Sequence, residues 1–262
     1  MVVPSTLCSN LYDFAFCPEP CYDRLVDLAD PEDWGPGNRI LKNYLSFSFS
    51  RAVYLVGRDA DHAVPSALPL VFADERCLFN TGLYTRRYEA IYALFEPNTR
   101  PDARQRWFLK GFFKESDPAL VAFEYLPCRV HFAEDPSQLV FDYRLPIRCN
   151  IDHILGDEEN LTRIPEALMG EGNSLLLRRA FEGAVAEAAR RAAANYTLAV
   201  PQFYGGRIQL LLPLCLTGDK PELALAVQRE DGFYSARTCL TIEMAYNNAR
   251  LICRPETSWI KR

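Results

Sequence analysis

The clearest periodic pattern in the chain lies between residues 174 and 195, SLLLRRAFEGAVAEAARRAAAN. Apolar side chains recur there every three or four positions, so that Leu177, Phe181, Ala184 and Ala188 share one face of a helix. The arginines of the same stretch fall on the other face. The pattern predicts a long amphipathic helix that buries its apolar side in the core.

Three other segments also favour helix. The stretch 40–56, ILKNYLSFSFSRAVYLV, combines helical spacing with aromatic residues, and a short helix is expected near Tyr22–Leu28. The last of them, EMAYNNARLI, follows the final strand pattern of the chain.

Strand patterns fill most of the remaining sequence. Apolar runs meet at turn residues in three places and predict hairpins, at Ala73-Asp74-Glu75-Arg76, at Gly205-Gly206 and at Asp231-Gly232. YEAIYALFEPN and RWFLKGFFKES are further apolar and aromatic runs, whereas the prolines of 119–146 predict short strands or turns.

This order of elements predicts an α+β fold, with a largely antiparallel β-sheet, a central long helix and short flanking helices. It does not fit alternating βαβ units. Because residues 1–38 are rich in proline, we expect an irregular N-terminal arm, followed by a single α+β domain over 39–262. Two lobes, 39–165 and 173–262, are the alternative division.

Composition limits the class of protein further. A 49% hydrophobic content predicts a substantial core, and a net charge of −5 means that any nucleic-acid site must be a local basic patch. Nine scattered cysteines, an odd number, favour free thiols over a disulfide framework, and their spacing predicts no metal site.

No apolar run of the sequence reaches the roughly 18–20 residues that a membrane-spanning helix needs. The first residues lack the features of a signal peptide, so a cytoplasmic location is expected.

The densest group of polar residues is RCNIDH, which contains Arg148, Asn150, Asp152 and His153. As a strand it would place the first three side chains on one face and His153 on the other. As a helix start it would use Asn150 or Asp152 as the cap, and the motif would be structural. The adjacency of Asp152 and His153 also disfavours a direct orienting bond between them. Both interpretations remain open at this point.

Two other motifs offer polar groups in apolar surroundings. LKNYL carries Lys42, a phosphate binder or nucleophile, beside Asn43 and Tyr44, although a lysine on the exposed face of a helix is the simpler interpretation. FNTGL is either a turn that receives a phosphate or base, or a backbone feature that needs the freedom of glycine. Its polar turn consists of Asn80, Thr81 and Gly82.

The C-terminal third adds amides. Gln209 lies in an otherwise apolar strand, so it must have a partner in the protein or in a ligand. The final helix carries a group whose side chains suit base-edge hydrogen bonding and stacking as well as an interior network. This group comprises Tyr246, Asn247, Asn248 and Arg250.

Several of these stretches together carry a family resemblance. ILKNYLSFSF, FNTGLYT, GFFKESDPAL, NIDHIL, AVPQFYGGRIQLLLPLCL and TCLTIEMAYNNARLI resemble the bacterial family known as domain of unknown function 3825. The resemblance runs from about Tyr22 to Trp259. Members occur alone or fused to OST-HTH (LOTUS) domains, which are RNA-binding modules, so the resemblance implies RNA-related biology by association. It supplies no catalytic residues.

Three functions follow as expectations. The first is an RNA-associated domain that binds RNA or a nucleotide end, with Lys42 and Arg148 on phosphate and Asn80 and Asn247 on polar edges. The second is a nucleotide-acting enzyme, for nucleotidyl transfer or phosphoester hydrolysis. Its candidate catalytic groups are His153, Asp152 and Lys42, with Mg²⁺ at Asp152 as an open alternative. The third is a non-catalytic interaction or regulatory module, in which the polar groups are satisfied within the fold.

Overall fold

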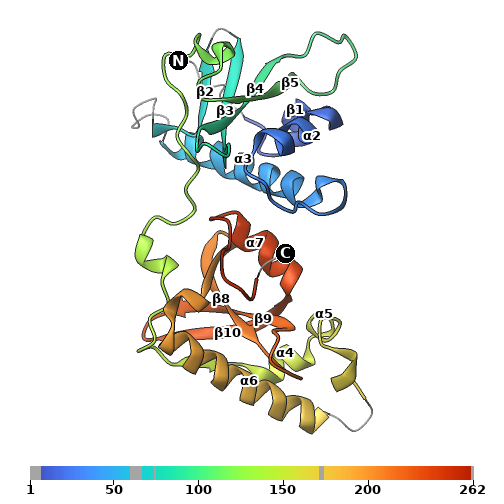
Figure 1. Ribbon diagram of the computed structural model, residues 1–262, viewed down its shortest axis with the longest axis vertical. Coiled ribbons are helices and arrows are strands. Elements are labelled where there is room, and N and C mark those ends of the chain that lie inside the picture. Colours follow the sequence, from blue (N-terminus) through green and yellow to red (C-terminus); the bar gives the residue numbers. More distant parts are fainter. Residues whose placement is uncertain (1–6, 60–66, 74, 171–173, 261–262) are drawn as a thin grey trace. The chain divides into compact units, whose positions relative to one another are not determined.

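The computed structural model describes residues 7–59, 67–73, 75–170 and 174–260, and the chain divides into two compact units, Met1–Val130 and His131–Arg262 (Figure 1). Each unit contains its own five-stranded sheet. The α+β class predicted from the sequence is confirmed, although the strands form two sheets. The boundary between the units falls after Val130, whereas the boundary of the expected lobes lies near residue 165.

Unit 1 builds a mostly antiparallel sheet in the order β1-β5-β4-β3-β2, in which only β1 runs parallel to its neighbour. Residues 7–38, expected as an arm, add β1 to the sheet edge and two helices. The helices and strands of unit 1 are α1 (Leu11–Phe14), β1 (Ala15–Phe16), α2 (Glu19–Leu28), α3 (Arg39–Asp59), β2 (Leu70–Ala73), β3 (Arg76–Tyr84), β4 (Ala90–Pro97) and β5 (Trp107–Lys114), with short 3₁₀ turns at Pro36–Asn38 and Pro118–Leu120.

The core of unit 1 forms between α3 and the sheet. Phe49 of α3 is fully buried and meets the ring of Phe79 edge-on, with centroids 5.5 Å apart. Phe14 packs on the other side of Phe49 at 4.8 Å. The other face of the sheet is covered by the segment after β5, through Leu120 and Phe123. Burial of large aromatic rings is the main favourable term in such a core.

Unit 2 has the sheet order β6-β10-β9-β8-β7, in which only β6 is parallel to its neighbour. Its helices and strands are β6 (Ile147–Cys149), α4 (Ile151–Gly156), α5 (Glu158–Leu161), α6 (Ser174–Ala194), β7 (Val200–Tyr204), β8 (Arg207–Leu214), β9 (Leu223–Glu230), β10 (Phe233–Thr241) and α7 (Ile242–Arg250), with 3₁₀ turns at Pro136–Leu139, Glu166–Leu168 and Tyr196–Leu198. The described residues of 119–146 form turns and 3₁₀ helix but no strand.

The predicted long helix is α6, and its apolar face lies on one face of the sheet of unit 2 (Figure 1). Phe181 and Ala188 pack there against Leu210 and Leu212 of β8. Helix α7 packs on the sheet through β7, β10 and β9. Because side chains alternate along a strand, Gln209, the residue before Leu210 in β8, belongs to the face away from α6.

All three predicted hairpins are present. Gly205 and Gly206 adopt φ values of 58° and 79°, and Gly232 adopts 78°, which is the left-handed backbone that a tight turn needs. In the β2–β3 hairpin Ala73 pairs with Arg76, and Glu75 takes the positive φ, while Asp74 lies outside the described residues.

Candidate functional site

The FNTG motif of unit 1 is a bulge in β3, where the register with β4 shifts between Asn80 and Tyr84. The Asn80 amide donates to the carbonyl of Pro127 at 2.9 Å, and its oxygen accepts from the Gly82 N–H at 2.9 Å. The Thr81 hydroxyl donates to the Ile91 carbonyl at 2.6 Å. These side chains are buried and hold protein groups, so the motif fixes the bulge.

Gly82 is required at this bulge for two reasons. Its φ is +72°, a conformation that L side chains rarely adopt. A Cβ at this position would lie 2.6 Å from the Tyr44 hydroxyl, which itself donates to the Thr81 carbonyl at 2.8 Å. The backbone interpretation of FNTGL is therefore the one that the fold uses, and Tyr44 supports it.

Lys42 connects α3 to α2. Its Nζ lies 2.6 Å from a carboxylate oxygen of Glu19 and 5.3 Å from the ring centre of Tyr22. Tyr12 donates its hydroxyl to the Lys42 carbonyl at 3.3 Å. The neighbouring Asn43 is exposed. The ammonium group of Lys42 already has a carboxylate and an aromatic face as partners.

The RCNIDH motif ends a strand and begins a helix. Asn150 is the N-cap of α4, and its side chain accepts from the His153 backbone N–H at 3.1 Å. The strand interpretation, with Arg148, Asn150 and Asp152 on one face, is therefore wrong, because β6 stops before the cap. Asp152 is ion-paired with Arg178 of α6, and the His153 imidazole is exposed. The side-chain partner of Asp152 is therefore Arg178 of α6.

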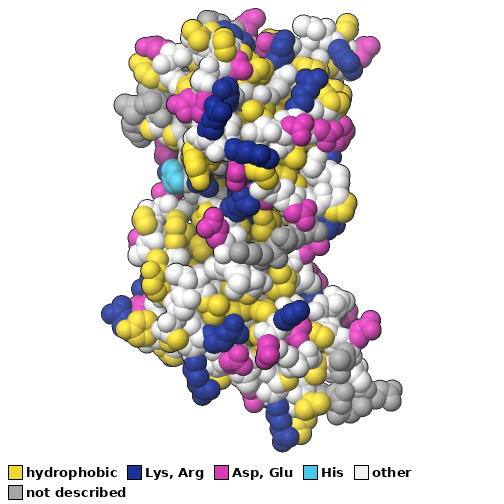
Figure 2. Space-filling model, in the orientation of Figure 1, with side chains coloured by type: hydrophobic (Ala, Val, Ile, Leu, Met, Phe, Trp, Pro, Cys, Tyr) yellow, Lys and Arg dark blue, Asp and Glu magenta, His cyan; other side chains and the backbone are white. Residues whose placement is uncertain are grey.

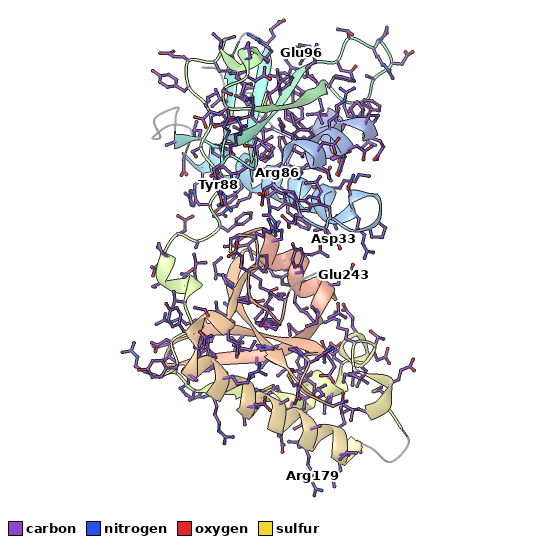
Figure 3. The ribbon with its side chains drawn as sticks, viewed as in Figure 1. Asp33, Arg86, Tyr88, Glu96, Arg179 and Glu243 are labelled. Carbon is purple, nitrogen blue, oxygen red and sulfur yellow. The ribbon has the colours of Figure 1, made fainter. Side chains whose placement is uncertain are left out.

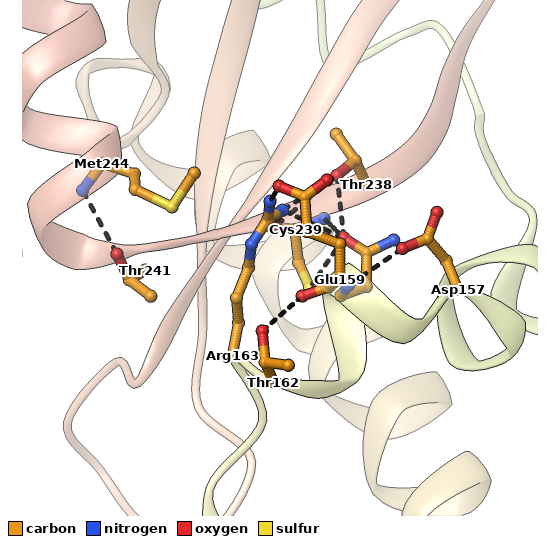
Figure 4. A network of polar contacts seen from close by, with 9 residues as sticks. Asp157, Glu159, Thr162, Arg163, Thr238, Cys239, Thr241 and Met244 are labelled. Carbon is orange, nitrogen blue, oxygen red and sulfur yellow. Dashed lines mark hydrogen bonds and ion pairs between the residues drawn. The ribbon is translucent and has the colours of Figure 1, made fainter.

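A second polar network joins α5 and the residues just after it to β10 (Figure 4). The buried Asn160 oxygen accepts from the Thr238 hydroxyl at 2.9 Å, next to the β-bulge of β10. Arg163 donates to the Cys239 carbonyl at 2.6 Å and to Asn160 at 3.1 Å, and it also pairs with Glu159. The donors and acceptors here satisfy each other, which is typical of a structural network.

A chain of amides crosses the sheet of unit 2. Asn248 of α7 donates to Gln202 of β7 at 3.0 Å, Gln202 donates to Gln209 of β8 at 2.8 Å, and Gln209 donates to Gln228 of β9 at 3.3 Å. Gln209 thus has the protein partners that its place in an apolar strand required.

The amide chain continues by strand register into β10 and β6. Gln228 lies opposite Ser235, and Ser235 lies opposite Arg148. Directly opposed residues share one face of a sheet. We call Gln202, Gln209, Gln228, Ser235 and Arg148 the polar row, since each of the five strands contributes one of these side chains.

The side chains of the polar row are buried at the Gln202 end and exposed at the Arg148 end, which we call the open end. Gln202 is 1% exposed, whereas Arg148 at the other end is exposed and its guanidinium lies 4.1 Å from the ring centre of Phe233. Ser235 donates to Glu230 at 3.3 Å, which places one carboxylate beside the row.

The hydrogen bonds of the amide chain all run in one direction, so its donor end faces Arg148. Each amide donates to the next, and the last donor, the Gln228 Nε2, has no hydrogen-bond acceptor among the described residues. Arg148 has no ion-pair partner in the same parts of the chain. The open end therefore presents the Gln228 donors and the Arg148 guanidinium, with the Glu230 carboxylate beside Ser235. Such donors suit a ligand rich in acceptors.

The other predicted residues of α7 are more enclosed. Tyr246 and Arg250 are 5% and 6% exposed, and the Asn247 side-chain oxygen is buried without a hydrogen-bond donor among the described residues. Of the candidates, Asn248 and Gln209 belong to the hydrogen-bonded amide chain, and Arg148 lies at the opposite end of the polar row from Asn248. The candidates of LKNYL and FNTGL belong to unit 1, which is a separate compact unit.

The contribution of β9 and β10 to the polar row was not predicted from the sequence. Gln228, Ser235 and Phe233 were not among the candidates. Gln228 directly follows the apolar run ELALAV, and Arg229 and Glu230 follow it, so the sequence there is typical of the polar end of a strand. Its place in the row is seen only in the contact with Gln209.

Figure 2 shows Lys and Arg side chains mixed with Asp and Glu over the displayed face. Within the described ranges no group of three His, Cys, Asp or Glu side chains is placed to hold a metal ion. No described helix is both long and apolar enough to cross a bilayer.

The architecture defines an α+β protein of two sheet-containing units. The model of the family Domain of unknown function (DUF3825) matches residues 25–259, nearly the whole chain, and the chain belongs to this family. No curated protein and no solved structure matches it.

Proposed function

We propose that the chain is an RNA-associated domain that binds RNA or a nucleotide end at the open end of the polar row. In this proposal Arg148 contacts a phosphate, the Gln228 amide donates to a phosphate, sugar or base oxygen, and the ring of Phe233 supports the guanidinium. A cytoplasmic location is part of the same proposal.

The observation that carries the proposal is the common orientation of the amide chain toward an unpaired arginine. The Gln228 donors and the Arg148 guanidinium lie on one face, and an arginine stacked on an aromatic ring retains its N–H edges for a planar or tetrahedral anion. Phosphate and sugar oxygens are the commonest acceptors in nucleic-acid complexes. The family resemblance supports the choice of RNA.

A catalytic role is less well supported by the contacts. Lys42 is paired with Glu19 and Asp152 with Arg178, so neither is a free nucleophile or metal ligand in this arrangement. Binding without turnover is therefore the form of the proposal, and the enzyme and the interaction module become outcomes of its test.

The test is a titration of the full chain with labelled single-stranded RNA and with a nucleoside 5′-monophosphate over a range of salt concentrations. Arg148→Ala should weaken binding and reduce the slope of log K against log salt by about 0.7, the contribution of one phosphate on a single strand. Gln228→Leu should weaken binding with little change in that slope, because it removes neutral donors.

The matched control is Arg179→Ala. Arg179 is an exposed arginine of α6, on the helix that covers the other face of the sheet, and it lacks an ion-pair partner among the described residues (Figure 3). Its loss changes net charge equally and should leave binding unchanged. The proposal is wrong if neither ligand binds at low salt, or if Arg148→Ala and Arg179→Ala behave alike.

A further inference from the structure

The turn between β3 and β4 of unit 1 exposes an aromatic ring that directly follows two arginines. Tyr88 is 85% exposed, and Arg86 and Arg87 beside it are exposed as well. Figure 3 shows Arg86 and Tyr88 at one end of unit 1, while Glu96 marks the other end of β4. Neither arginine has a carboxylate partner among the described residues.

The turn is rigid although it is exposed. The buried Thr85 accepts on its hydroxyl from the backbone N–H groups of Arg87 at 3.3 Å and Glu89 at 3.2 Å. Its own N–H donates to the Glu89 carbonyl at 2.9 Å, and the Tyr88 N–H donates to the Thr85 carbonyl at 2.9 Å. Both ends of the turn are thereby hydrogen-bonded to one residue, Thr85, so the backbone that carries Tyr88 has a defined conformation.

Tyr88 is held in an unfavourable backbone conformation. Its φ is +62°, and a bulky aromatic residue in this region is an outlier, since glycine, asparagine or aspartate would fit with less strain. The side chain gains no burial in return. Strain without a packing reason is typical of a residue kept for contact with a ligand.

The acidic residue of the turn is directed away from the arginines. Glu89 accepts from the Lys114 ammonium at 3.3 Å and from the Ser116 backbone N–H at 3.3 Å. At the base of the turn, the N–H of Asp30, which follows α2, donates to the Tyr84 carbonyl at 2.8 Å. The charge of Glu89 is thus engaged by Lys114, and two arginines remain beside the ring.

We infer that the Arg86-Arg87-Tyr88 turn is a second contact for single-stranded nucleic acid, in which a base stacks on Tyr88 and the arginines neutralise the adjacent phosphates. A flat exposed ring with neighbouring arginines matches the chemistry of single strands, whose bases offer π-faces and whose backbone offers regularly spaced anions. The inference rests on the ligand class of the proposed function and assigns it to a separate surface.

A lipid surface fits this turn less well. A single tyrosine ring offers little apolar area to insert, and amphipathic anchors combine several large apolar side chains with a basic face. Two arginines alone supply only a weak attraction to anionic lipids. Lipid binding is therefore treated as an outcome of the test.

The test compares Tyr88→Asn with Tyr125→Asn in the full chain, by titration with a short single-stranded RNA. Asn tolerates the positive φ of position 88, so Tyr88→Asn should fold at least as well as the wild type. Loss of one base–aromatic stack should reduce affinity by about tenfold. Tyr125 is an exposed tyrosine of the same unit that lies beside Glu124, and its replacement should leave affinity unchanged.

A second variant separates charge from stacking. Arg86→Gln with Arg87→Gln should lower the salt slope by about 1.4, twice the single-phosphate value, while Tyr88→Asn should leave the slope nearly constant. Photo-crosslinking with a thiouridine-containing RNA should label the peptide that contains the turn. Vesicles with anionic lipid should bind wild type and Tyr88→Asn equally.

The two binding surfaces can fail separately. If Arg148→Ala weakens RNA binding while the Tyr88 and arginine variants do not, the second contact is excluded and the proposed function stands. If the Tyr88 variants weaken binding and Arg148→Ala does not, the turn is the binding surface and the polar row is not. Crosslinks confined to unit 2, or stronger binding to vesicles than to RNA, would overturn the inference.

Discussion

The side-chain nitrogen of Gln202 lies 2.8 Å from the side-chain oxygen of Gln209, directly across the β7–β8 pair. Through this contact Asn248 of α7, which donates to Gln202, is connected to the other members of the polar row. Gln202 is 1% exposed and is the most buried member of the row.

Replacement of Gln202 by leucine should destabilise the protein. The Gln209 oxygen loses its donor and the Asn248 amide loses its acceptor, and each buried polar group left without a partner costs about 1–3 kcal/mol. Chemical denaturation should show the loss, whereas Gln138→Leu, on an exposed 3₁₀ turn, should stay within about 0.5 kcal/mol of the wild type. Equal stability of the two variants would contradict the role given to the row.

Two glycines of unit 1 should respond oppositely to the same substitution. Gly82→Ala forces a side chain into φ +72° and against the Tyr44 hydroxyl, and the backbone strain alone costs about 1–3 kcal/mol. Gly57→Ala, in α3 with nothing within 4 Å of a new Cβ, should stabilise by about 0.5–1 kcal/mol. Thermal unfolding of both variants tests the bulge, and a tolerated Gly82→Ala would argue against it.

Asn160→Ala should remove the acceptor that joins α5 to β10. Thr238, Arg163 and the Cys239 N–H all donate to this one oxygen, so a loss of about 1–3 kcal/mol is expected. Asn43→Ala, an exposed asparagine of α3, serves as the matched change. Hydrogen exchange should show that β10 opens more readily in Asn160→Ala only.

The stability of unit 2 should fall in acid through Asp142. The Arg144 guanidinium beside it lowers the pKa of the Asp142 carboxyl to about 2, and Arg229 lies 3.8 Å away. Because this folded-state pKa is below the ordinary value of about 4, the stabilisation is present above pH 4 and is lost as the pH falls through 2. In Arg144→Gln the midpoint of the Asp142 titration by NMR should move upward, while in Arg179→Gln it should not.

Thiol reactivity should follow burial along the chain. Burial raises the pKa of Cys17 to about 12 and that of Cys239 to about 11, so both thiols stay protonated at neutral pH. Cys8 and Cys253 are exposed and should be alkylated before the buried thiols by iodoacetamide. Mass spectrometry after limited alkylation gives the order, and early modification of Cys17 would show that the N-terminal segment opens in solution.

Local sequence patterns were sufficient for most of the fold. The helical period of 174–195 and the glycine turns at 205–206 and 232 act over a few residues, so the elements that they predict are α6 and the hairpins β7–β8 and β9–β10. The parallel pairings of the edge strands β1 and β6 were not predicted. These strands pair over long separations, Ala15 with Trp107 and Ile147 with Tyr234, which no local pattern encodes.

The candidate residues also divide into those whose role depends on nearby residues and those whose role depends on distant ones. Asn150 could be recognised as a cap or a strand residue, and the backbone after β6 decided for the cap. From the sequence alone, Lys42 and Asp152 are candidate reactive groups. In the fold, Lys42 forms an ion pair with Glu19, and Asp152 forms one with Arg178.

The sequence by itself determined that Gln209 needed a partner and that Arg148 was available to bind an anion. Only the tertiary structure aligned them, because the order and register of five strands decide which side chains share a face. A shift of one residue in any strand would turn its member of the polar row toward α6. The chemistry of each residue is local, whereas their convergence depends on pairing between distant segments.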